Sequence, residues 1–177
     1  VIGTGWIIRN LAHNKIVHAY DQNKNLKSYV LKEIKRTSKS IKKLFGKKIL
    51  IKNLKFFNSL EKALVNVDFV QESVLENYKV KTDLIHKISK YVKSDIIISS
   101  SSSGLLPSKI FSKSENPQRG IIGHPFNPAY LLPAVEIVPG KKTTKKFLLD
   151  ANKYYKSISM KPIMLKKELP GYLSDRL

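Results

Sequence analysis

The sequence predicts an α/β fold in which a mostly parallel sheet carries helices on its faces. Short runs rich in Ile, Val and Phe alternate with longer amphipathic stretches, which is the pattern of repeated βαβ units. The run Ile96-Ile97-Ile98 is apolar throughout, as is typical of a strand buried on both faces. A length of 177 residues, 42% of them hydrophobic, suits one domain with a single core.

Helices and strands are expected to alternate through the first half of the chain. In order, the predicted elements are a helix over 4–12, a strand over 16–20, a helix over 26–44, a strand over 54–57, a helix over 59–64 and a strand over 67–70. The long helix is predicted from its apolar residues, which recur at helical spacing in a Lys-rich stretch and are expected to be buried: Leu26, Val30, Ile34, Ile41 and Leu44. Ser59 is predicted to cap the next helix, because its hydroxyl can accept a bond from a main-chain amide.

The same alternation continues through the second half. The predicted elements are a helix over 78–92, strands over 96–98, 120–123 and 134–138, a helix over 142–158 and a strand over 162–165. Between two of them lies an uninterrupted run of serine from Ser99 to Ser103, which could be a low-complexity linker. We interpret it instead as a structured loop, because it directly follows a core strand and precedes Leu105.

The net charge of +20 is the strongest compositional signal. It raises the possibility of a nucleic-acid partner. The cations, however, are 29 Lys and 4 Arg, spread over every segment. Arg is the side chain preferred for reading phosphates and bases. We therefore expect solvated surface lysines and no nucleic-acid partner, and we keep a basic nucleic-acid-binding module as an alternative.

Composition and spacing exclude several other classes. The chain has no cysteine, so neither a disulfide framework nor thiolate chemistry is available. No apolar run approaches the roughly 18 residues of a membrane span, and no signal peptide is visible. We expect a cytoplasmic protein with no membrane partner. No spacing of His, Asp and Glu is typical of a metal site, so no metal is predicted.

The N-terminus resembles part of a dinucleotide-binding motif. Residues 1–6 read Val-Ile-Gly-Thr-Gly-Trp, and dinucleotide folds place G-x-G-x-x-G between the first strand and the first helix. If Gly3 is the third glycine, the first two glycines and the first strand would precede residue 1. Asp21 then falls where an acid binds the ribose, which favours NAD over NADP. The sequence therefore predicts a Rossmann-like sheet that is truncated at the N-terminus, with the first strand missing.

A second group of residues supplies acid–base chemistry. His124 and Asn127 each precede a proline, which favours a stiff, extended turn after the strand over 120–123. Open α/β sheets bind ligands at the carboxyl ends of their strands. Glu136 lies in an otherwise apolar strand and needs a partner, because an unpaired buried carboxylate is costly. His124 is the natural candidate, and the pair would make the imidazole a general base.

Ser103 adds a hydroxyl that could bond to a substrate oxygen. Together the hydroxyl, imidazole, amide and carboxylate suit oxidation of an alcohol. A hydrolase triad of Ser103, His124 and Glu136 is an alternative, although Ser103 lacks the G-x-S-x-G elbow. A second alternative is purely structural: His124 would be a turn histidine with its hydrogen bonds satisfied, and Glu136 would be an exposed glutamate. The other histidines, His13, His18 and His86, are interpreted as structural.

At these residues the chain resembles the N-terminal domain of the 3-hydroxyacyl-CoA dehydrogenase family. The resemblance extends over essentially the whole chain without large gaps. It implies that Ser103 is the active-site serine and that His124 is the catalytic base. It also implies that Asn127 is the active-site asparagine and that Glu136 is the acid paired to the histidine.

The family resemblance also supplies cofactor contacts. Residues 76–81 read Glu-Asn-Tyr-Lys-Val-Lys and match the family's Glu-Asn-x-Lys-x-Lys segment. This match implies that Glu76 and Lys81 lie near the nicotinamide-ribose end of NAD. The residues expected to bind NAD are thus Gly3, Asp21, Glu76, Lys81, Ser103 and Asn127.

Within the family, the segments 101–108, 123–133 and 167–177 are most like the members that oxidise L-carnitine. Acyl-CoA enzymes usually have Phe in place of Pro125 and Asn in place of Asp175. An acid there would suit a quaternary ammonium group, to which Phe126, Tyr130 or Tyr172 could add cation–π contact of about 0.5–2 kcal/mol. The expected substrate contacts are Ser103, Tyr130 and Asp175.

The predicted function is NAD-dependent oxidation of a secondary 3-hydroxyl, with L-carnitine converted to 3-dehydrocarnitine. The alternative substrate is a 3-hydroxyacyl-CoA of fatty-acid metabolism, which the positive charge would favour. A non-catalytic structural relative is an alternative of another class, since the family includes lens proteins.

The expected organisation is an incomplete NAD-binding domain over 1–168, followed at 169–177 by the start of a helical domain. In the family that second domain mediates dimerisation and completes the substrate pocket. We therefore expect a homodimer for the full-length protein and no activity for this fragment alone.

Overall fold

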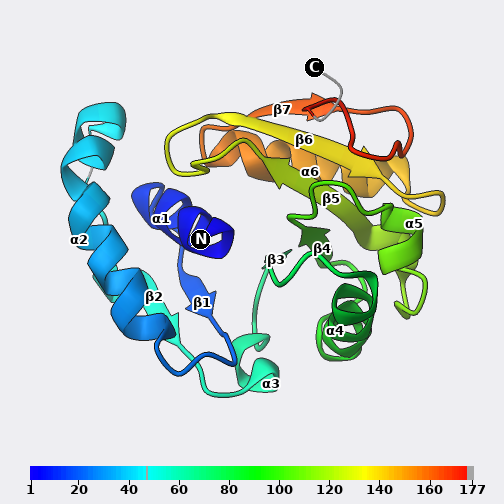
Figure 1. Cartoon of the computed structure of the whole chain (residues 1–177), viewed down its shortest axis with the longest axis horizontal. Coiled ribbons are helices and arrows are strands. Elements are labelled where there is room, and N and C mark those ends of the chain that lie inside the picture. The colour runs from blue at the N-terminus through cyan, green and yellow to red at the C-terminus, as the bar shows by residue number, and fades with distance from the viewer. Residues whose placement is uncertain (47, 175–177) are drawn as a thin grey trace.

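The computed structural model describes residues 1–46 and 48–174 and shows helices packed on both faces of a sheet (Figure 1). Short 3₁₀ turns lie at Ile51–Asn53 and Pro117–Arg119. In chain order the other elements are α1 (Ile2–Ala12), β1 (Val17–Ala19), α2 (Leu26–Phe45), β2 (Leu54–Phe56), α3 (Leu60–Ala63), β3 (Phe69–Glu72), α4 (Tyr78–Tyr91), β4 (Ile97–Ser100), α5 (Pro107–Ile110), β5 (Gly120–Pro125), β6 (Ala134–Pro139), α6 (Lys145–Ser157) and β7 (Lys161–Met164).

The strands form a five-stranded sheet and a separate parallel pair. The larger sheet has the order β3-β4-β5-β6-β7, and β1 pairs with β2. Neighbouring strands are parallel throughout, except that β5 and β6 run antiparallel. The predicted α/β fold with a mostly parallel sheet is therefore confirmed.

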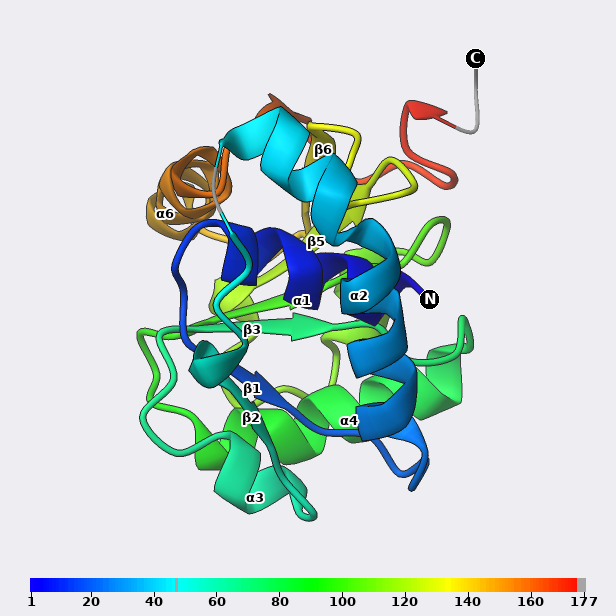
Figure 2. The same cartoon turned by 90° about the vertical axis from the view of Figure 1, so that its left-hand side faces the viewer.

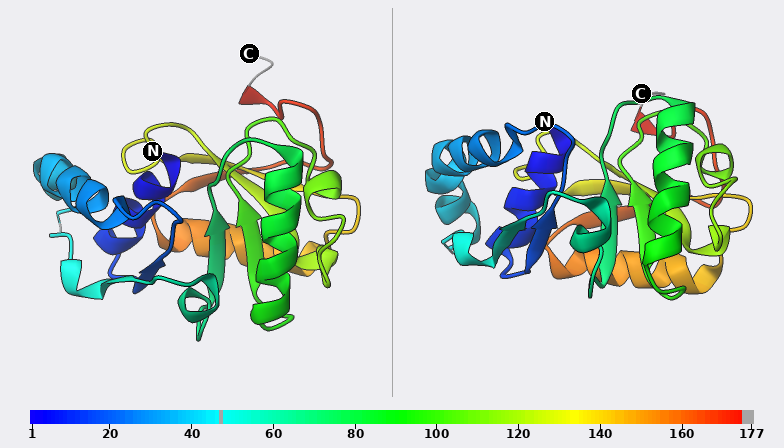
Figure 3. Two further views of the ribbon diagram at one scale, coloured as in Figure 1. Left: turned by 60° about the horizontal axis from the view of Figure 1, so that its bottom comes forward. Right: turned by 90° about the horizontal axis from the view of Figure 1, so that it is seen from below.

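The larger sheet buries apolar side chains on both faces, as its Ile- and Val-rich strands predict. Alternate residues of each strand point to opposite faces. Ile97 and Ile121 join a core with Tyr155 of α6, whereas the adjacent Ile98 and Ile122 join one with α4 and α5. Figure 3 shows α4 on one side of the strands and α6 on the other.

A third core holds the first two helices together. It buries Ile8 and Leu11 of α1 against Val30, Ile34 and Ile41 of α2. These three α2 residues are among the five whose spacing predicts the helix. Leu26 packs against the same cluster, but Leu44 is 53% exposed, so its predicted burial is wrong. Figure 2 shows α2 lying over α1, with the strands behind them.

The sheet is interrupted between β1 and β3. These strands belong to separate sheets, although α1 packs against both of them. In a Rossmann-like strand order, the first strand of the domain lies at this place. The interruption therefore agrees with the expected absence of the first strand from residues 1–177.

Several predicted boundaries are wrong, and one of them affects the site. The strand predicted over 67–70 is Phe69–Glu72, the strand over 96–98 continues to Ser100, and α5 was not expected. The strand over 120–123 continues through Pro125, so His124 lies inside β5 and not in a turn after it. Because β4 pairs with β5 only as far as Ile122, this end of β5 is free on that side, where a proline is tolerated.

Two of the four arginines are structural. Arg9 donates to the carbonyls of Ala129 and Leu132, and burial lowers its pKa to about 10. Arg119 is fully buried and donates to the carbonyl of Ser89 at 2.8 Å. Neither guanidinium is therefore presented to an external polyanion.

In the described part of the chain, no helix is long and apolar enough to cross a membrane.

Candidate active site

Three parallel strands end at the same edge of the larger sheet and bring the predicted chemical groups together. β3, β4 and β5 are parallel neighbours, so their carboxyl ends coincide. The segment that contains Glu76 follows β3, and the loop over 101–106, called the serine loop below, follows β4. His124 lies near the end of β5. Open α/β sheets form their ligand sites at this edge.

His124 and Glu136 form a hydrogen-bonded pair across two strands. They are direct partners in the antiparallel register of β5 and β6, and His124 Nδ1 lies 2.8 Å from Glu136 Oε2. The Glu136 side chain is fully buried, and 12% of the His124 side chain is exposed. A carboxylate on Nδ1 favours the tautomer with hydrogen on that nitrogen, which leaves Nε2 as an acceptor. The predicted pairing of these two residues is confirmed.

Glu136 also accepts bonds from the segment that follows β7. The amides of Leu173 and Ser174 donate to Oε1 at 2.8 and 3.2 Å, and the Ser174 hydroxyl donates to Oε2 at 2.9 Å. Burial would raise the pKa of Glu136, but the bonds from His124, Leu173 and Ser174 outweigh burial and hold the pKa below its usual value. The carboxylate therefore stays ionised beside the imidazole.

The serine run is a structured part of the sheet edge, as predicted. Ser99 and Ser100 lie inside β4, and Ser101 and Ser102 are also buried. The Ser101 hydroxyl bonds to three side chains: Trp6 Nε1 at 3.0 Å, Gln71 Nε2 at 2.9 Å and Ser73 Oγ at 2.8 Å. These bonds tie α1, β3 and the serine loop together.

A buried ion pair that the sequence pattern does not predict lies beneath this loop. Lys81 Nζ is 2.9 Å from Glu72 Oε1, and neither side chain is more than 1% exposed. Glu72 also accepts the hydroxyl of Ser100. The signal for Glu72 was the same as for Glu136, an acid in an apolar strand, but the strand was predicted to end before it.

Glu76 connects the ion pair to the serine loop. Its Oε1 accepts the Ser102 hydroxyl and the amides of Ser103 and Gly104, the latter two at 2.9 and 3.2 Å. Its other oxygen lies 3.4 Å from Lys81 Nζ. Partial burial would raise the pKa of Glu76, but these hydrogen bonds and the lysine charge lower it overall. An ionised Glu76 thus fixes the main chain at Ser103.

Tyr172 links the serine loop to the imidazole. Its hydroxyl donates to the Leu105 carbonyl at 2.7 Å, and its ring centroid lies 5.7 Å from that of His124. The residue is fully buried, and burial raises the pKa of its phenol. The loop after β4 and the end of β5 therefore lie side by side.

The other predicted contacts differ in their surroundings. Asn127 is exposed two residues beyond β5, and the Phe126 ring lies 6.2 Å from that of His124. Tyr130 is partly buried and packs against the cluster between α1 and α2. Asp175 lies outside the described residues.

Gly3 and Asp21, two of the residues expected to bind the cofactor, lie at positions that suit a dinucleotide. Gly3 lies in the first turn of α1, and a Cβ placed on it would meet Ser73 Cβ at 3.4 Å, so the helix N-terminus lies beside the end of β3. A helix N-terminus suits a pyrophosphate. Asp21 is exposed just after β1, where its Oδ1 accepts the Asn23 amide at 2.8 Å. A free carboxylate oxygen at this position suits a ribose.

The remaining histidines bind main-chain carbonyls, as structural histidines do. The distances are 2.8 Å from His13 to Arg9, 2.9 Å from His18 to Ala63 and 2.7 Å from His86 to Lys113. Among residues 1–46 and 48–174, no group of three or more His, Asp or Glu could hold a metal ion.

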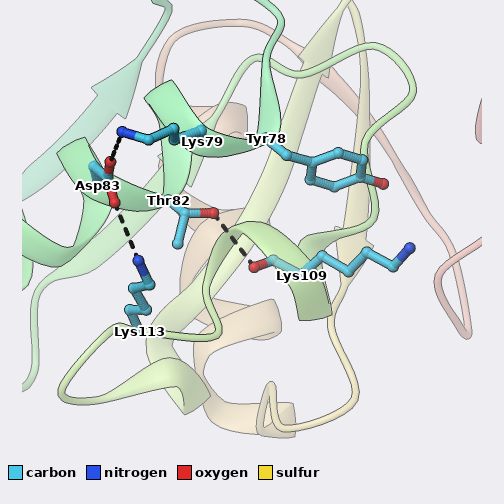
Figure 4. A pocket seen from close by; sticks show the side chains of 6 residues that line it. All are labelled: Tyr78, Lys79, Thr82, Asp83, Lys109 and Lys113. Carbon is cyan, nitrogen blue, oxygen red and sulfur yellow. Dashed lines mark hydrogen bonds and ion pairs between the residues drawn. The ribbon is translucent and has the colours of Figure 1, made fainter.

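A recess of about 350 Å³ lies between α4 and α5, away from the imidazole. Figure 4 shows Lys79 and Lys113 directed at Asp83, at 3.1 and 3.3 Å, with Tyr78 on the wall. The Tyr78 hydroxyl accepts the Leu106 amide at 3.2 Å. This wall therefore supports the serine loop from outside.

Relatives of known activity match the full length of the chain. The L-carnitine dehydrogenase of Pseudomonas putida is 41% identical, and the alignment covers 100% of this chain and 56% of the relative. The L-carnitine dehydrogenase of Oceanobacillus iheyensis is 40% identical over 100% and 58% of the two chains. The chain thus spans little more than half the length of these curated relatives.

Solved structures show the same fold at lower identity. A diketoreductase superposes with a TM-score of 0.91 at 23% identity, over 100% of this chain and 65% of that one. The 3-hydroxybutyryl-CoA dehydrogenase of Escherichia coli superposes with a TM-score of 0.84 at 22% identity, over 92% and 35%. These likenesses confirm the Rossmann-like architecture.

The family model for the NAD-binding domain of 3-hydroxyacyl-CoA dehydrogenase matches residues 1–169. With the paired histidine and glutamate at the carboxyl edge of the sheet, this match shows that the chain belongs to the 3-hydroxyacyl-CoA dehydrogenase family, whose NAD-binding domain it contains.

Proposed function

We propose that this chain forms part of an NAD-dependent dehydrogenase that oxidises a secondary 3-hydroxyl, with L-carnitine converted to 3-dehydrocarnitine. The observation that carries the proposal is the 2.8 Å bond between His124 Nδ1 and Glu136 Oε2 at the carboxyl edge of the sheet. A base held in one tautomer by a buried carboxylate is what removal of an alcohol proton requires.

In this mechanism His124 Nε2 accepts the hydroxyl proton of the substrate. The charge that develops on the imidazole is stabilised by Glu136, whose carboxylate is already ionised. Such proton transfer typically contributes a factor of about 10²–10⁴ to the rate. NAD⁺, when bound, supplies the acceptor for the hydride.

Ser103 and Asn127 are proposed to position the reacting oxygen and the nicotinamide. Glu76 accepts the main-chain amide of Ser103, so the Ser103 hydroxyl is not needed to hold the loop in place. Asn127 is exposed just past the end of β5. The proposed direct NAD contacts are these two residues together with Gly3, Asp21 and Glu76. Lys81 was expected to join them, but its side chain is buried in the ion pair with Glu72, so its proposed role is to hold Glu76.

The choice of L-carnitine is supported by the relatives named L-carnitine dehydrogenase and by local residues. Phe126 lies close enough to His124 for its ring to contact a quaternary ammonium group of a substrate bound there. Asp175 is proposed as a further substrate contact. The alternative is a 3-hydroxyacyl-CoA of fatty-acid metabolism, supported by the family's name and by the net charge of +20.

We extend the proposal to the rest of the protein. Residues 1–168 would form the NAD-binding domain, and the chain from 169 would lead into a helical domain that completes the substrate pocket. The protein would work in the cytoplasm as a homodimer on a small-molecule substrate. No nucleic acid is proposed as a partner.

The test is a steady-state assay of the full-length protein. NAD⁺ reduction is followed with L-carnitine and, separately, with 3-hydroxybutyryl-CoA. We expect turnover of L-carnitine. Turnover of the thioester alone would replace the first substrate with the second, and turnover of neither would contradict both.

A further inference from the structure

Ser174 lies between the two members of the proposed catalytic pair. Its hydroxyl is 2.9 Å from Glu136 Oε2 and 3.4 Å from His124 Nδ1, and its amide is 3.2 Å from Glu136 Oε1. Among the described residues, Ser174 and His124 are the side chains that bond to Glu136. The position was not singled out in the sequence, where a serine before an aspartate carries no signal.

The bonds around Glu136 leave its carboxylate little freedom. Oε1 accepts the amides of Leu173 and Ser174, and Oε2 accepts the Ser174 hydroxyl and His124 Nδ1. An ionised carboxylate has about four acceptor positions. The donors therefore match the capacity of the group, and each oxygen is held from two sides.

The backbone of the preceding residues directs this segment at Glu136. Gly171 and Tyr172 both have left-handed conformations, with φ of 68° and 48°. Such a turn is unfavourable for a side chain as large as tyrosine, so it requires compensating contacts. Tyr172 has them, because it is fully buried and its hydroxyl holds Leu105 at 2.7 Å.

From this geometry we infer that Ser174 is a positioning residue, whose hydroxyl orients Glu136 so that His124 keeps its hydrogen on Nδ1. Without the hydroxyl, Oε2 keeps only the imidazole as a donor, and the carboxylate can turn about the bonds that the main-chain amides make to Oε1. The effect on rate rests on the function proposed above. The effect on the imidazole does not.

The first test reads the imidazole directly. Nitrogen NMR of histidine-labelled protein reports which ring nitrogen carries hydrogen. Ser174→Thr and Ser174→Val have the same shape and differ by the hydroxyl. We expect His124 to remain a single Nδ1–H tautomer in the native protein and the Thr variant, and to become a mixture of tautomers in the Val variant. The same tautomer in all three proteins would overturn the inference.

Two internal controls come from the same chain. The signals of His18 and His86, which bond to the carbonyls of Ala63 and Lys113, should be identical in all variants. Ser157→Ala removes an exposed hydroxyl that donates to the Tyr154 carbonyl, and it should leave His124 unchanged. Changes at His18 and His86 equal to those at His124 would mean general unfolding and would count against a positioning role.

The second test is kinetic and uses the full-length protein. Loss of a hydrogen bond to a charged group should lower kcat on the order of tenfold in Ser174→Val, with KM for NAD⁺ unchanged and with activity restored in Ser174→Thr. An unchanged kcat would contradict the role of Ser174. If the native protein oxidises no 3-hydroxy substrate, the proposed function fails, and the NMR comparison still decides the inference.

Discussion

The carboxylate of Glu76, on the segment after β3, accepts the main-chain amide of Ser103, on the loop after β4, at 2.9 Å. The same oxygen accepts the Gly104 amide at 3.2 Å, and Lys81 lies 3.4 Å from the other oxygen. The backbone of the serine loop is thus set by one ionised side chain from a neighbouring segment. The position of the Ser103 hydroxyl depends on this contact.

Glu76→Gln should loosen the serine loop. The amide keeps the size of the carboxylate but loses its charge, and hydrogen bonds to charged groups contribute about 1.5–3 kcal/mol. We expect faster hydrogen exchange at the Ser103 and Gly104 amides and a free energy of unfolding lower by about 1–3 kcal/mol. Glu61→Gln, at an exposed glutamate of α3, is the matched control and should change neither quantity.

Lys81→Met should be among the most destabilising single changes at this edge. It leaves the Glu72 carboxylate buried without its cation, which costs about 3–5 kcal/mol. Lys79→Met, in an exposed pair with Asp83, should cost less than about 1 kcal/mol. Urea unfolding of both variants measures the difference, and equal losses would contradict the structural role of the buried pair.

Adding Glu72→Leu to Lys81→Met should recover part of the stability, because an apolar pair of similar volume removes the unpaired charge. The double variant is predicted to be more stable than Lys81→Met alone. A double variant that is less stable would mean that Glu72 stabilises the edge mainly through Ser100 and not through the lysine.

Stability should depend on the ionisation of Glu136 and Glu76. The pKa values of both are lowered in the folded state, so their contribution is fully present above the ordinary glutamate pKa of about 4.3. It is lost as the pH falls below that value and through the lowered folded pKa. We expect the free energy of unfolding of Glu136→Gln to be smaller at pH 7 and to fall less steeply on acidification. Parallel curves for variant and native protein would contradict this assignment.

Gly123→Ala should disturb the strand that carries His124. A Cβ at this buried position would lie 1.8 Å from the Tyr155 hydroxyl and 2.5 Å from Ser99 Oγ. Overpacking of this kind costs about 1–3 kcal/mol. Gly104→Ala, where a Cβ would meet nothing within 4 Å, should have little effect on the midpoint of thermal unfolding. Equal midpoints for the two variants would contradict this packing.

The sequence predicts those parts of the fold that depend on local pattern. Amphipathic spacing identifies the long helix through Val30, Ile34 and Ile41, all of which are buried. An acid in an apolar strand predicts that Glu136 needs a partner, and the register of β5 and β6 supplies His124 directly opposite. Local rules suffice here because one strong constraint, a buried charge, has few solutions.

Contacts between distant segments are not predictable in the same way. Glu72 and Ser174 become part of the site only because α4 and the chain after β7 return to the sheet edge. The length of β5 also depends on a neighbour, since Pro125 is tolerated where β4 no longer pairs with it. The packing of Tyr130 against the cluster between α1 and α2 is another contact between distant segments.

His124, held by Glu136, is proposed to remove the proton of a substrate hydroxyl. The most direct test of this proposal is the turnover of His124→Gln in the full-length protein with NAD⁺ and L-carnitine, together with the affinity for NAD⁺ in the absence of substrate. We expect kcat to fall by about 10²–10⁴ with unchanged NAD⁺ affinity. Unchanged turnover in His124→Gln would contradict the proposal.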